Sequence, residues 1–159
     1  MEELKHFNMK LVENDGRTVY NLEETGCMII EHKSLVGEYY PLSTKEVLNV
    51  LDRYNVLKDL KSIEIFNTSL VNSQARAQVD KTAVTFYVNS NLIFTDPRVK
   101  GFPERKAALW GVLHEIGHLL DPNVHLKMSA EYYHTKAEPV ADKFACEEVE
   151  KLWGKLIKE

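Results

Sequence analysis

Apolar residues recur at helical spacing in three stretches of the chain: residues 43–60, 104–121 and 137–155. The first opens on Ser43 with Glu46 three positions later, which is the spacing of a capping box. The second begins beside Pro103 and ends before Pro122, because proline is tolerated in the first turn of a helix but cannot continue one. The pattern therefore predicts three helices.

Alternating or β-branched stretches between the first two helices predict strands at residues 62–67, 75–80, 83–89 and 91–95. A short turn, Asp80-Lys81-Thr82, joins the second and third of these strands, which favours a hairpin. The third strand is either the edge of the sheet, where a peptide could add, or an interior strand. A set of three or four strands with three helices predicts an α+β domain over residues 41–159.

The first 40 residues are harder to interpret. Asn14-Asp15-Gly16 separates two short apolar stretches and predicts a β-hairpin, and Met28-Ile29-Ile30 predicts a further short strand. We treat residues 1–40 as an N-terminal extension that caps the domain, covers a cleft or binds a regulatory protein partner.

Composition narrows the class of protein. A chain of 159 residues is the size of one domain, and its net charge of −4 disfavours nucleic-acid binding, which usually leaves a basic surface. No apolar run is long enough to span a membrane, and the charged N-terminus lacks the apolar segment of a secretory signal, so a cytoplasmic protein is expected. Cys27 and Cys146 are far apart in sequence and are interpreted as free thiols.

The second predicted helix carries the most specific chemistry. It contains His114-Glu115-Ile116-Gly117-His118, an HExxH pattern. Residues four apart lie on the same face of a helix, so the two imidazoles can bind one zinc ion. Glu115 is then placed to accept a proton from a zinc-activated water. Gly117, a costly residue within a helix, predicts close approach of a neighbouring element.

A catalytic zinc ion usually has three protein ligands and an open position. The strongest third ligand is Glu138, in the first turn of the last helix, with Asp142 one turn later as an acceptor for the far nitrogen of a liganding histidine. The alternative is His125. Asp121 and Val124 occupy the positions where metzincins have glycine and histidine, so that spacing fails here. In the other interpretation, Glu138 only complements its helix dipole and Asp142 is a surface charge.

These residues carry a family resemblance. HExxH followed by Glu138-x-x-x-Asp142 resembles the gluzincin signature, and residues 138–145 resemble the E-x-x-A-[ND]-x-F-A segment of ImmA/IrrE-type peptidases. The resemblance covers residues 43–155, with Pro139 departing from the usual pattern. It implies a small zincin-like domain in which Glu138 binds one zinc ion.

The expected function is a zinc metallopeptidase that cleaves a peptide or protein substrate with Glu115 as general base. The alternative is a zinc-binding sensor or regulatory protein of the same fold with little or no proteolytic activity. Gluzincins also use a Tyr or His to stabilise the oxyanion, and Tyr132, Tyr133 and His134, in the predicted loop between the two metal-binding helices, are candidates for that role.

Overall fold

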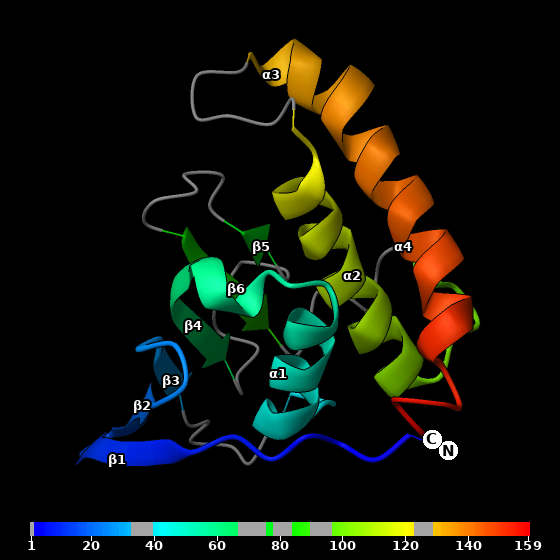
Figure 1. The fold of residues 1–159 in the computed structure, drawn as a ribbon. Coiled ribbons are helices and arrows are strands. Elements are labelled where there is room, and N and C mark those ends of the chain that lie inside the picture. Colours follow the sequence, from blue (N-terminus) through cyan, green and yellow to red (C-terminus); the bar gives the residue numbers. More distant parts are fainter. Residues whose placement is uncertain (1, 33–39, 67–75, 78–83, 90–96, 123–128) are drawn as a thin grey trace.

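The computed structural model describes residues 2–32, 40–66, 76–77, 84–89, 97–122 and 129–159. These residues form a mixed α/β architecture in which the described strands make one sheet and the long helices gather on one side of it (Figure 1). The predicted α+β class is therefore confirmed. None of the helices in the described ranges is long and apolar enough to cross a membrane.

The N-terminal segment contributes three strands to this sheet. β1 (Met9–Asn14), β2 (Arg17–Leu22) and β3 (Met28–His32) pair antiparallel in that order. The hairpin predicted at residues 14–16 is present, and Gly16 adopts the positive φ, 73°, that such a turn needs. The described sheet has six strands, more than the three or four predicted, because β1 to β3 continue it.

The strand pairing changes from antiparallel to parallel beyond β3. β4 (Leu60–Phe66) lies parallel to both β3 and β6 (Val84–Asn89), and β5 (Arg76–Ala77) pairs antiparallel with β6. The order of the described strands is β1-β2-β3-β4-β6-β5, so β6 is an interior strand and β5 lies at the edge of the described sheet. The antiparallel pairing of β5 with β6 agrees with the hairpin predicted between residues 75–80 and 83–89, whose turn lies outside the described residues. The further strand predicted at residues 91–95 lies outside the described residues.

The helix α1 (Thr44–Arg53) connects β3 to β4 and starts as the sequence predicts. The Ser43 backbone N–H donates to Glu46 Oε1 over 2.9 Å, and the Glu46 N–H donates to Ser43 Oγ over 3.1 Å, completing the capping box. α1 ends earlier than the predicted residue 60. Asn55 adopts a φ of 59°, which breaks the helix, and a short 3₁₀ turn, η1 (Leu57–Asp59), follows.

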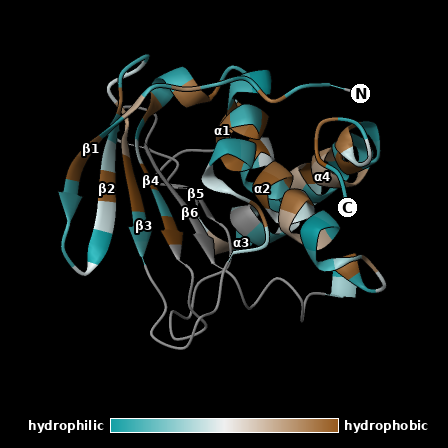
Figure 2. Cartoon of the chain, turned by 90° about the horizontal axis from the view of Figure 1, so that it is seen from below, coloured by the Kyte–Doolittle hydropathy of each residue, from teal (hydrophilic) through white to brown (hydrophobic). Residues whose placement is uncertain are grey.

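The two helices that carry the predicted motifs pack against each other. α2 (Glu104–Leu120) is buried over most of its length and lies between the sheet and α4 (Glu138–Leu152) (Figures 1 and 2). A Cβ atom added at Gly117 would lie 3.0 Å from Ala141 Cα, so the glycine permits the close approach of α4 that the sequence predicted. The contact between the two helices brings His114 and His118 of α2 close to polar residues in the first turns of α4.

Candidate metal centre

The HExxH residues lie on a buried part of α2. His114 and Glu115 are each 6% exposed and His118 is 2% exposed. Imidazole and carboxylate groups are rarely buried to this extent without polar partners or a bound ion. The two histidines, one helical turn apart, project from the same face, with ring centroids 4.8 Å apart.

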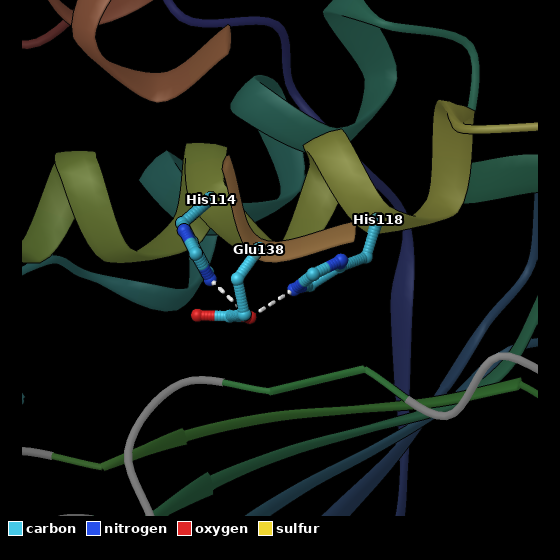
Figure 3. Close-up of side chains that lie close together, drawn as sticks. All are labelled: His114, His118 and Glu138. Carbon is cyan, nitrogen blue, oxygen red and sulfur yellow. Dashed lines mark hydrogen bonds and ion pairs between the residues drawn. The ribbon is translucent and has the colours of Figure 1, made fainter. Parts of the chain in front are cut away.

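Glu138, from the first turn of α4, completes the cluster. Its Oε1 atom lies 3.1 Å from His114 Nε2 and 2.7 Å from His118 Nε2 (Figure 3). Glu138 is twenty residues from His118 in sequence, and the packing of α4 on α2 places it there. The structure thus brings together the three residues that the sequence selected as metal ligands.

The donor set fits a zinc ion. One atom from each of His114, His118 and Glu138 lies within 4.8 Å of the others, and two imidazoles with one carboxylate match the ligands of catalytic zinc sites. Zinc–ligand bonds of about 2.1 Å in a tetrahedral site place ligand atoms about 3.4 Å apart. The observed distances from Oε1 to the two Nε2 atoms are slightly shorter, so a small opening of the cluster suffices.

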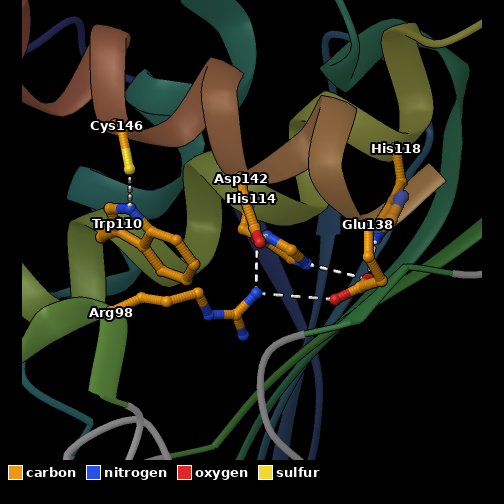
Figure 4. Close-up of polar contacts among 7 residues, drawn as sticks. All are labelled: Arg98, Trp110, His114, His118, Glu138, Asp142 and Cys146. Carbon is orange, nitrogen blue, oxygen red and sulfur yellow. Dashed lines mark hydrogen bonds and ion pairs between the residues drawn. The ribbon is translucent and has the colours of Figure 1, made fainter. Parts of the chain in front are cut away.

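Two further charged residues border the cluster (Figure 4). Asp142 Oδ1 lies 2.9 Å from His114 Nδ1, an ion-pair contact without hydrogen-bond geometry. The Arg98 guanidinium pairs with the same Asp142 oxygen and lies 3.6 Å from Glu138 Oε2. Asp142 therefore lies beside the far nitrogen of His114, for which the sequence predicted an acceptor, but no hydrogen bond joins these two described groups.

Aromatic packing fixes the first histidine. The Trp110 ring stacks on the His114 ring, with centroids 5.1 Å apart and planes 24° apart. Its indole Nε1–H donates to Cys146 Sγ over 3.5 Å, so α4 in turn holds the tryptophan. Cys146 and Cys27 are both free, as predicted, and burial raises the pKa of the Cys27 thiol to about 12.

The proposed oxyanion residues do not lie in a loop. The chain ahead of α4 is helical: α3 (Ala130–Tyr132) continues into η4 (Tyr133–Ala137), a π-helical turn. Pro139 has no N–H to donate to the carbonyl of residue 135, which disfavours a regular α-helical turn there. Tyr132 is partly exposed and His134 exposed, and the side chain of Tyr133 lies outside what the structure describes. Their role in catalysis stays a prediction.

Sequence reasoning missed Arg98 and Trp110. Arg98 belongs to η3 (Pro97–Val99), a short 3₁₀ turn before α2 with no periodic pattern to mark it. Trp110 carried a usable signal, because it precedes His114 by four residues and so lies on the same face of the helix. His125, the alternative ligand, lies outside the described residues.

In comparisons with known proteins, no family model, no curated protein and no solved structure matches the chain.

Proposed function

We propose that this chain is a zinc-dependent metallopeptidase of the gluzincin type. The observation that carries the proposal is that Glu138 Oε1 lies close to the Nε2 atoms of both His114 and His118. The glutamate comes from α4 and the histidines from α2, so helical spacing alone does not bring the three together. The burial of both histidines supports it, because neutral imidazoles in a shielded site are suited to bind zinc.

Each residue then has a role. His114, His118 and Glu138 would hold the ion, which as a Lewis acid would lower the pKa of a water toward neutrality. Glu115, next to His114 on α2, is the general base: it accepts the proton of the attacking water and returns it to the leaving amine. The negative charge of Asp142, 2.9 Å from His114 Nδ1, would favour the tautomer of His114 that carries its proton on Nδ1 and leaves Nε2 available as a ligand.

The sheet offers a place for an extended substrate. Within the described residues β5 is the edge strand beside α2, and an edge strand offers backbone N–H and C=O groups with which another chain can pair. Strands of the sheet pass opposite the cluster (Figure 3). We propose that the peptide adds to this edge, which would bring its scissile carbonyl toward α2.

The test compares the wild-type chain with Glu115→Gln. The substitution removes the base and keeps the shape of the side chain, so we expect stoichiometric zinc in both proteins and chelator-sensitive cleavage of mixed peptide libraries only in the wild type. Glu104→Gln, an exposed position at the start of the same helix, is the matched control and should cleave normally. Full activity in Glu115→Gln would rule out the mechanism.

The same experiment distinguishes a zinc peptidase from the alternative, a zinc-binding sensor or regulatory protein. Zinc bound at one ion per chain, with no cleavage of any peptide, would favour a zinc-binding sensor or regulatory protein. The absence of bound zinc in the wild-type chain would rule out both.

A further inference from the structure

Arg98 reaches the candidate metal centre from a third element. It belongs to η3, ahead of α2, whereas the three ligands come from α2 and α4. Its guanidinium pairs with Asp142 Oδ1 and lies 3.6 Å from Glu138 Oε2 (Figure 4). One arginine therefore bridges two carboxylates that are one helical turn apart on α4.

The two oxygens of Glu138 face different partners. Oε1 points at the two histidines, and Oε2 faces the guanidinium of Arg98. A carboxylate whose second oxygen is held in this way binds a metal ion through one atom, which keeps a coordination position open for water. We infer that Arg98 is a positioning residue of the metal centre, which holds Glu138 and Asp142 in their productive orientations. This inference rests on the proposed zinc site.

The arginine is itself held in place. Its Cζ atom lies 4.8 Å from the centroid of the Trp110 ring, a cation–π contact, and the same ring stacks on His114. The guanidinium is planar and permanently charged, so it can stay close to the aromatic ring while one of its nitrogens, Nη1, contacts both carboxylates. A lysine keeps the charge but lacks the plane. The identity of the residue therefore matters, as well as its charge.

A positioning role and a purely electrostatic role of Arg98 predict opposite changes in zinc affinity when Arg98 is replaced. A positive charge beside a bound cation repels it, so removing Arg98 would tighten metal binding if charge alone mattered. A positioning role predicts weaker binding, because Glu138 and Asp142 lose the contact that orients them. Loss of residues that orient metal ligands typically weakens metal affinity by about 10- to 100-fold. The sign of the change separates the two roles.

The experiment measures zinc affinity by competition with a chromophoric chelator, and the visible absorption of the Co²⁺-loaded protein. The variants are Arg98→Met and Arg98→Lys, with Arg53→Met as a control, since Arg53 pairs with Glu2 on the exposed surface. We expect zinc to bind about 10-fold more weakly to Arg98→Met, with Arg98→Lys between it and the wild type. Co²⁺ absorption should fall in Arg98→Met, because Glu138 then binds through both oxygens and raises the coordination number above four.

Zinc binding by Arg98→Met as tight as in the wild type, or tighter, with an unchanged Co²⁺ spectrum would overturn the inference. Should Arg98→Met fail to fold by circular dichroism, Arg98→Lys decides: weaker binding supports the inference and unchanged binding overturns it. Neither result affects the proposed function, which fails only if the wild-type chain binds no zinc or cleaves no peptide.

Discussion

Asp142 is a single residue shared by two partners. Its Oδ1 atom contacts His114 Nδ1 at 2.9 Å and also pairs with Arg98. The carboxylate therefore neutralises the arginine and also favours the tautomer of His114 that leaves Nε2 available as a ligand. Both effects depend on its negative charge, which an amide of the same shape lacks.

The substitution Asp142→Asn tests this dependence. We expect zinc affinity to fall by about 10-fold, because the negative charge that favours the Nδ1-protonated tautomer of His114 is lost. Chelator competition measures the change. Asp52→Asn is the matched control, since Asp52 forms a 3.6 Å ion pair with Lys5 on the exposed surface. Equal zinc affinity in Asp142→Asn and the wild type would show that the contact has no part in metal binding.

Single residues of the site differ in how well the sequence predicts them. His114, Glu115 and His118 follow from helical spacing, and Glu138 with Asp142 follows from the same spacing on the next helix. Arg98 does not, because its place depends on how the chain before α2 folds back toward α4. Local periodicity carries no information on such a contact.

Between elements, the distance from α2 to α4 depends on Gly117. A methyl group there would meet Ala141 Cα at 3.0 Å and Phe144 Cδ1 at 3.3 Å. The tight contact involves the Ala141 backbone, so α4 would have to shift by a few tenths of an ångström to admit the methyl group. Glu138 belongs to the helix that moves, whereas both histidines belong to the other. Helix packing and the proposed metal centre are therefore coupled at this glycine.

Gly117→Ala should lower the free energy of unfolding by about 1–3 kcal/mol, the usual cost of overpacking, despite the better helix propensity of alanine. Zinc affinity should fall with it, because Glu138 is displaced from the histidines. Urea unfolding and chelator competition measure the two effects. Lys143→Ala, on the exposed side of α4, is the control and should change neither. A stability equal to that of the wild type would contradict the close packing.

The first and last residues of a helix could be predicted from the sequence where prolines limit the helix. Pro103 and Pro122 delimit α2 as predicted. The end of α1 was not predictable, because the left-handed Asn55 reflects how the chain enters β4 and not the apolar pattern before it. The helical segment ahead of α4 was also missed, since its polar residues resemble a loop.

On the scale of the whole molecule, Arg105 ties distant parts of the chain together. It pairs with both oxygens of Glu46 and donates to the carbonyls of Pro41 and Lys158. Burial by itself raises the pKa of Glu46. The hydrogen bonds and positive charge of Arg105, together with the hydrogen bonds of Ser43, outweigh burial and hold the pKa below its ordinary value of 4.5.

The sign of the pH dependence follows. A carboxyl whose pKa is lower in the folded chain stabilises the fold above its ordinary pKa, and this contribution is lost as the pH falls from about 4.5 through the folded-state pKa. Glu46→Gln should therefore be less stable at pH 7 by about 2 kcal/mol and lose less stability on acidification. Urea unfolding between pH 3 and 7 measures both. Parallel pH profiles for the two proteins would exclude this role of Glu46.

Zinc binding should also stabilise the whole molecule, because the ligands come from two helices that meet only in the folded chain. A ligand specific for the folded state adds about 2.7 kcal/mol at a hundredfold excess over its Kd. For a chain of this size that corresponds to a rise in Tm of about 5–10 °C. We expect this rise by calorimetry, and its reversal by a chelator. Glu138→Gln should abolish it and Glu131→Gln, on exposed α3, should preserve it. An equal rise in Glu138→Gln would place the ion elsewhere.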